Sequence, residues 1–168
     1  MPTPIFQVYE SGGTTVATSH SFGQVKAGND SAVYTVEVWN NKGGSSPVSD
    51  VIEATVTVTD ASGGNTGDVV TGKYMNVNVN NETASGGGGS TLAWTAIGGT
   101  TKAPIRAAAY TSANDSGGGG KFDGTVPAGT TAATATANCG IMQFKIVLPN
   151  NATSGKKTGK IRFEGYYV

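Results

Sequence analysis

The single histidine and the single cysteine are the residues of this chain most readily used for catalysis. His20 stands between Ser19 and Ser21 in the sequence TSHSF, where an imidazole could activate a serine hydroxyl as a general base. An exposed histidine on the polar face of a strand is the more common situation, and the sequence contains no G-x-S-x-G motif. Cys139 precedes an apolar segment and is interpreted as a small, partly buried residue. We therefore predict no catalytic residues and no enzymatic activity.

Metal ligands are equally sparse along the chain. One histidine and one cysteine far apart in sequence cannot form a structural zinc centre by themselves, and no D-x-D-x-D-G calcium loop occurs. Four aspartates in expected turns could join backbone carbonyls around Ca²⁺, although solvated turn aspartates are commoner; they are Asp60, Asp68, Asp115 and Asp123. The glycine-rich stretches adjoin expected strands rather than helices, which argues against a phosphate-binding loop. We predict neither a cofactor nor a bound metal.

Aromatic side chains remain as candidates for binding. Trp39 and Trp94 fall on expected strands, where exposed indole rings could stack on sugar rings. Trp39 would share a strand face with Thr35 and Glu37. The ring could instead pack under a loop or at a subunit contact. Glycan stacking through the two tryptophans, in a carbohydrate- or host-receptor-binding module, is therefore the alternative function.

Alternation of apolar and polar residues is the dominant pattern of the sequence, and it predicts half-buried β-strands. The pattern is clearest in residues 31–40, 50–60, 140–149 and 159–168. In 50–60 it places Ile52, Ala54, Val56 and Val58 on the core side, with Glu53, Thr55, Thr57 and Thr59 toward solvent. Weaker strand candidates are 5–10, 16–22, 73–79, 91–97, 105–110 and 131–137.

Composition and turn chemistry complete the prediction of the fold. The chain has 26 glycines among 168 residues and only 13% charged residues, and no window shows an apolar stripe with helical spacing. Many short strands separated by Gly, Asn, Asp and Pro clusters predict an all-β, antiparallel β-sandwich. Runs of four glycines at 86–89 and 117–120 predict long Gly-rich loops within one domain spanning 1–168.

Charge and hydropathy exclude several kinds of partner. The 11 Lys and Arg residues balance the 11 Asp and Glu residues, which disfavours electrostatic capture of nucleic acid or of an anionic membrane. No apolar run reaches the length of about 18 residues that a membrane-spanning helix requires. The first ten residues do not resemble a signal peptide, so we expect synthesis in the cytosol.

Three segments carry a resemblance to a known group of proteins. The sequence FGQVKAGNDSAVYTVEVWNNKG resembles a strand and its flanking turns in immunoglobulin-like domains, without the paired cysteines of antibody domains. The C-terminal LPNNATSGKKTGKIRFEGYYV resembles the end of such a domain. With IFQVYESGGTTV near its start, the chain is similar to immunoglobulin-like β-sandwich structural proteins of tailed bacteriophages, which include capsid decoration (cement) proteins and tail-associated modules.

This resemblance implies a non-enzymatic virion protein, made in the host cytoplasm, that stabilises the particle through strand and loop contacts. The implied partners are the major capsid protein or other virion subunits and further copies of the chain, with a trimer favoured. The expected contact residues lie near the two ends of the sequence; they are Ile5, Phe6, Val8, Tyr9, Tyr166 and Tyr167. Residues 1–13 are expected to form either an extended N-terminal arm or simply the first strand of the sandwich.

Overall fold

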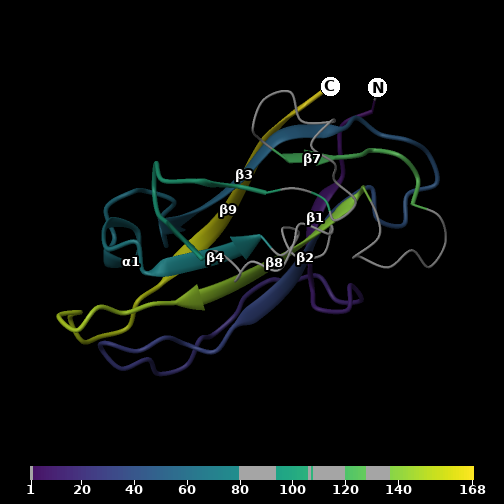
Figure 1. Cartoon of the computed structure of the whole chain (residues 1–168). Helices are drawn as coiled ribbons and strands as arrows, with labels where there is room; N and C mark the ends of the chain where they lie inside the picture. Colours follow the sequence, from purple (N-terminus) through teal and green to yellow (C-terminus); the bar gives the residue numbers. More distant parts are fainter. Residues whose placement is uncertain (1, 80–93, 106, 108–119, 128–136) are drawn as a thin grey trace, which may run out of the picture.

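The fold is an antiparallel β-sandwich with one very short helix, as the sequence predicted (Figure 1). The computed structural model describes residues 2–79, 94–105, 107, 120–127 and 137–168. Both glycine runs lie outside these residues, except for Gly120, the first residue of strand β7. No helix among the described residues is long and apolar enough to cross a membrane.

The first sheet has five strands in the spatial order β1-β2-β8-β4-β5. Their bounds are β1 Phe6–Glu10, β2 Tyr34–Asn40, β8 Cys139–Ile146, β4 Met75–Val79 and β5 Thr95–Ile97. All neighbouring pairs are antiparallel. The predicted segments 5–10, 73–79 and 91–97 thus contain β1, β4 and β5, and residues 6–10 form the first strand rather than a free arm.

The second sheet is built around β3, Val51–Asp60, which pairs antiparallel with all three other strands. These are β6, Ala103–Pro104, β7, Gly120–Phe122, and β9, Gly159–Tyr167. Thr55 and Val56 pair with β6 and with β9 at once, so β9 must lie on the opposite side of β3 from β6. The four-residue helix α1, Asp68–Thr71, follows β3 and buries Val69 and Val70.

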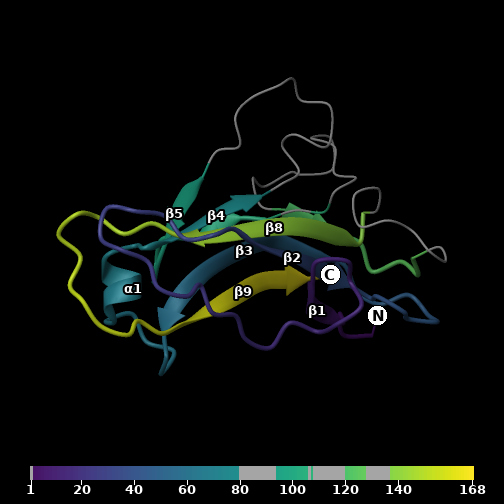
Figure 2. The ribbon, with the colours of Figure 1, turned by 90° about the horizontal axis from the view of Figure 1, so that it is seen from below.

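The core lies between the two layers, with β4 and β8 in one and β3 and β9 in the other (Figure 2). It is filled mainly by valine, isoleucine, methionine and phenylalanine side chains. The largest fully buried apolar side chains are Phe122, Phe144, Ile97, Ile105 and Met142. Phe122 comes from the short strand β7, which sequence alternation did not reveal because its preceding residues are glycines.

One weaker strand prediction fails within the described residues. The segment 16–22 makes one isolated bridge, Tyr9 with Val16, and then leaves the sheet. Farther along this segment, the His20 and Phe22 rings pack on Tyr34 at the start of β2. Most of the predicted segment 105–110 lies outside the described residues, and the short strand β6 ends just before it, at Pro104. Most of 131–137 lies outside the described residues.

A β-bulge corrects the predicted core face of β3. The register with β9 shifts between Ile52 and Thr55, and Glu53 has a φ of 51°. The extra residue reverses the alternation at this point, because a one-residue slip exchanges the two faces of a strand. Val51 is therefore buried, and Ile52, which the sequence placed in the core, is only half-buried.

The faces predicted to meet solvent are partly covered. On β2, Glu37 and Trp39 are buried because Tyr9, Lys42 and the turn at Gly12 lie over them. On β3, Thr57 and Thr59 are buried as well. The Thr57 hydroxyl donates to the carbonyl oxygens of Gly99 and Thr101, at 3.0 and 2.9 Å, which compensates its burial.

Candidate functional site

His20 is exposed, as the sequence suggested, and its ring is held by aromatic neighbours. It stacks on Tyr34 with the ring centroids 3.6 Å apart and meets Phe22 edge-on at 4.8 Å. The Ser21 hydroxyl accepts a hydrogen bond from the Gly23 amide at 3.3 Å. These contacts give His20 a packing role that fastens the segment after β1 to the start of β2.

Cys139 is fully buried, deeper than the partly buried position expected for it. It lies directly opposite Trp39 in the β2–β8 register. Burial, reinforced by the charge of Glu37, raises the pKa of the Cys139 thiol far above its ordinary value. The neutral thiol is therefore strongly favoured, and a reactive thiolate at this position is disfavoured.

The turn aspartates are engaged by neighbouring donors. Asp60 accepts hydrogen bonds from the amides of Ser62 and Gly64, at 3.0 and 2.8 Å, and from the Ser62 hydroxyl at 2.6 Å. Bonds from Ser62, Gly64 and Thr66 hold the pKa of Asp60 well below its usual value. Asp68 pairs with Lys157, and Asp123 with Lys121. Asp115 lies outside the described residues, among which no cluster of three or more metal-ligating side chains occurs.

Trp39 has no ring face open to a sugar, which removes it from the glycan-stacking alternative. Its exposed fraction is 4%, and its indole Nε1 donates to Glu37 Oε2 at 2.8 Å. The Lys42 ammonium lies 4.5 Å from its ring centroid and 4.4 Å from that of Tyr9. Trp94 is half-buried, with the Lys145 ammonium 4.7 Å from its ring centroid.

The predicted contact residues differ in how far they are exposed to solvent. Val8 packs against the core from β1, and Tyr9 is half-buried beneath Lys42. Ile5 is 43% exposed, and Phe6 packs edge-on against Phe122 with ring centroids 5.1 Å apart. Tyr166 and Tyr167 extend from the end of β9 with 68% and 63% of their surfaces exposed.

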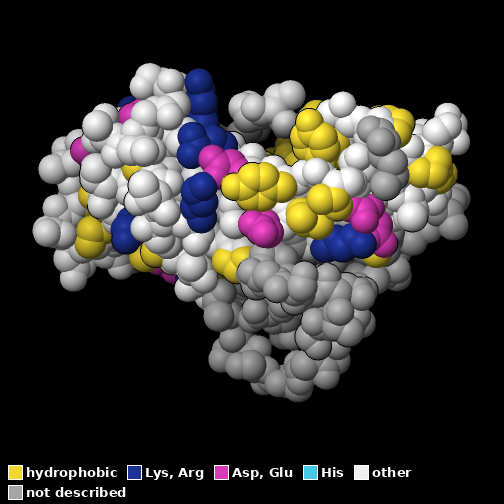
Figure 3. Space-filling view, turned by 90° about the horizontal axis from the view of Figure 1, so that it is seen from above, with side chains coloured by type: hydrophobic (Ala, Val, Ile, Leu, Met, Phe, Trp, Pro, Cys, Tyr) yellow, Lys and Arg dark blue, Asp and Glu magenta, His cyan; other side chains and the backbone are white. Residues whose placement is uncertain are grey.

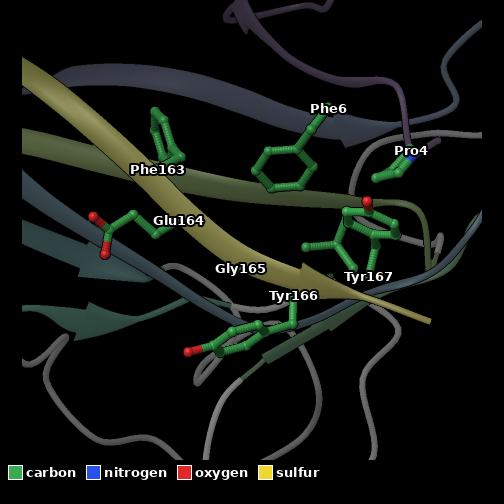
Figure 4. A pocket seen from close by; sticks show the side chains of 8 residues that line it. Pro4, Phe6, Phe163, Glu164, Gly165, Tyr166 and Tyr167 are labelled. Atoms are coloured by element: carbon green, nitrogen blue, oxygen red, sulfur yellow. The ribbon is translucent and has the colours of Figure 1, made fainter.

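An open hollow of about 330 Å³ lies between β1 and β9, and Phe6 and the two tyrosines line it. Tyr167 lies on the same side of β9 as Phe6, whereas the Tyr166 ring points to the other side of the strand (Figure 4). We call it the terminal hollow; its lining residues are Pro4, Phe6, Val51, Phe163, Glu164, Gly165, Tyr166 and Tyr167. Phe6 and Phe163 form its apolar floor, with ring centroids 6.4 Å apart. The two ends of the chain lie close to each other at this end of the sandwich (Figures 1 and 2).

Gly165, which lines the terminal hollow, lies very close to strand β3. A Cβ atom at Gly165 would lie 2.7 Å from the Val51 side chain and 3.2 Å from the Ile52 carbonyl oxygen. Gly165 therefore lets β9 approach β3 closely beside the bulge. Pro4, Val51 and Glu164 were not predicted as contact residues, because their proximity depends on pairing between distant strands.

Comparison with known proteins identifies no relative. No family model matches the chain, and neither the curated proteins nor the solved structures contain a significant match.

Proposed function

We propose that this chain is a non-enzymatic structural protein of a tailed-phage virion, most simply a capsid decoration protein, and that it assembles through the face around the terminal hollow. The observation that carries the proposal is the exposed pair Tyr166 and Tyr167 beside an apolar hollow. Tyrosines supply much of the binding energy of protein interfaces because they bury a large ring and keep a polar tip. Val168 continues this apolar surface, with 61% of its area exposed.

The surroundings of the terminal hollow support a protein partner. Glu164 lines the terminal hollow and pairs with Arg162 and Lys102. Figure 3 shows hydrophobic and charged side chains interspersed on one face of the molecule. An apolar centre with a charged rim is the usual arrangement of a specific protein interface. The virion assignment rests on the sequence resemblance, and the antiparallel sandwich is compatible with it.

The test uses particles of the tailed phage whose genome encodes the chain. We expect mass spectrometry of purified particles to detect the chain, and we expect purified protein to rebind particles that lack it. The double variant Tyr166→Ser/Tyr167→Ser should bind at least about tenfold more weakly, because two large interface rings are removed.

A matched control is Val16→Ser/Val33→Ser, which removes two exposed apolar side chains, 48% and 50% exposed, that do not line the terminal hollow. This control should bind like the wild type. Absence of the chain from the particles would overturn the virion assignment. Equal binding by the two double variants would overturn the assignment of the contact face.

A further inference from the structure

Strand β9 forms an edge of the second sheet. All nine of its residues, Gly159–Tyr167, belong to a strand whose one pairing partner among the described residues is β3. An edge strand of this length presents backbone N–H and C=O groups that another strand can pair with. The strand contains no proline, and its charged residues Lys160 and Arg162 are exposed, whereas Glu164 is half-buried.

The charged residues of β9 have a self-complementary order. Arg162 and Glu164 are two residues apart, so their side chains share one face of the strand. They form an exposed ion pair within the chain, with Arg162 Nη2 2.8 Å from Glu164 Oε1, and Lys102 also pairs with Glu164. Exposed ion pairs of this kind contribute little stability, so their members can change partners at small cost.

We propose that two copies of this chain associate by antiparallel pairing of β9 with β9, about a two-fold axis that passes by Phe163. In that register Arg162 of each copy lies opposite Glu164 of the other, and Lys160 lies opposite Tyr166. A two-fold interface requires such a self-complementary surface. Each contact between one residue of the first copy and a different residue of the second copy is repeated with the two copies exchanged. Directly opposite charges of unlike sign stabilise an antiparallel pair, and like charges destabilise it.

The inner face of the same strand fits this arrangement. Phe163 is half-buried and lines the terminal hollow, and the two-fold axis places it opposite Phe163 of the second copy. The two hollows then adjoin across the axis, and their apolar floors are removed from water together. This pairing rests on the proposed function, since it gives the homotypic contact of the same face. It produces dimers, so the trimer that the resemblance favours would require a different contact.

Two charge reversals test the register. Arg162→Glu places glutamate opposite glutamate in a homotypic pair, and Glu164→Arg places arginine opposite arginine. By light scattering after size-exclusion chromatography, we expect the wild type to be a dimer and each single variant to associate at least about tenfold more weakly. An equimolar mixture of the two variants should regain dimers, because both cross-strand pairs then become Glu with Arg.

Lys156→Glu is the matched control for Arg162→Glu: it makes the same change of net charge at an exposed residue of the loop before β9, and it should remain dimeric. Circular dichroism of each variant confirms folding, and recovery of dimers in the mixture excludes misfolding as the cause. A monomeric wild type, dimeric single variants or a mixture that fails to associate would each overturn the pairing. The pairing alone fails if the charge variants stay dimeric while Tyr166→Ser/Tyr167→Ser loses particle binding; the proposed function then stands.

Discussion

Glu37 closes the outer face of the first sheet beside Trp39. Its carboxylate accepts hydrogen bonds from the Trp39 indole at 2.8 Å and from the Gly12 amide at 3.1 Å. The Lys42 ammonium lies 3.7 Å from the same carboxylate and also donates to the Gly13 carbonyl oxygen. A buried carboxylate needs such compensation, so this cluster explains how a charged residue on β2 can be covered.

The first prediction concerns the side chain of Glu37. Glu37→Ala leaves a buried indole N–H and a backbone amide without their acceptor, and it should lower the free energy of unfolding by about 2–3 kcal/mol. Glu37→Gln keeps an acceptor oxygen and should cost less than about 1.5 kcal/mol. Urea denaturation measures both values. Equal unfolding midpoints for Glu37→Ala and the wild type would contradict the role given to this cluster.

Tyr34 gives a prediction for alkaline pH. Burial, then the 2.9 Å hydrogen bond to Glu10 and the charge of that residue, raise the pKa of Tyr34 from 10.0 to about 12. Between these two values the unfolded chain loses the tyrosine proton while the folded chain keeps it. The Tyr34 contribution to stability is therefore complete below pH 10 and is lost as the pH rises toward 12.

The measurement compares the wild type with Tyr34→Phe by chemical denaturation at several alkaline pH values. The variant should lose stability less steeply with rising pH, because it lacks this titrating group. The remaining tyrosines and lysines titrate in both proteins, and subtracting the two curves removes their effect. Parallel curves would show that Tyr34 titrates with the same pKa in the folded and unfolded states.

At the scale of the elements, the bulge in β3 decides which side chains reach the core. Glu53 adopts a φ of 51°, a left-handed conformation that is unfavourable for residues other than glycine and, to a lesser degree, asparagine. The Glu53 side chain is exposed, so its contribution to stability comes chiefly from the backbone. The bulge lets Val51 and Ala54 both face the core although they are three residues apart.

The order of stability at Glu53 tests this conformation. Glu53→Gly should be as stable as the wild type within about 1 kcal/mol, because relief of strain offsets the greater entropy of the unfolded chain. Glu53→Val should be less stable by about 1–2 kcal/mol, since a β-branched residue is poorly accommodated at positive φ. The same two substitutions at Thr55, which lies beyond the bulge, should show the reverse order. Thermal denaturation of the four variants decides the question.

At the scale of the whole molecule, buried asparagines join segments that are far apart in sequence. Asn40 is fully buried and accepts a hydrogen bond from the Ile5 amide at 3.2 Å. Its side-chain amide donates to the carbonyl oxygens of Ser49 and Phe122, at 3.0 and 3.3 Å. These bonds connect the segment before β1, the end of β2, the approach to β3 and β7. The Asn40 side chain therefore links the first sheet to the second.

Removal of this side chain should destabilise the entire sandwich. Asn40→Ala removes three hydrogen bonds to backbone groups and should cost about 3 kcal/mol in the free energy of unfolding. It should also increase hydrogen exchange at the Ile5 amide. The comparison variant is Asn76→Ala, at a half-buried position within β4, which should cost less than about 1 kcal/mol. Similar losses for the two variants would contradict this role.

The sequence by itself determined the fold class and the position of the long strands, because alternation is a local pattern with the period of the strand. The segments containing β2, β3, β8 and β9 were predicted in this way, and so was the solvent exposure of His20. Glycine-rich turns and the lack of helical spacing required no knowledge of distant contacts.

Only the tertiary structure decided which strand faces are covered and which distant residues meet. Trp39 alternates like a solvent-facing residue, yet it is buried because Lys42 and the turn after β1 close over it. Phe6 and Phe163 meet because closure of the sandwich brings the edges β1 and β9 together. Burial and proximity of this kind depend on packing between segments distant in sequence, which local periodicity does not encode.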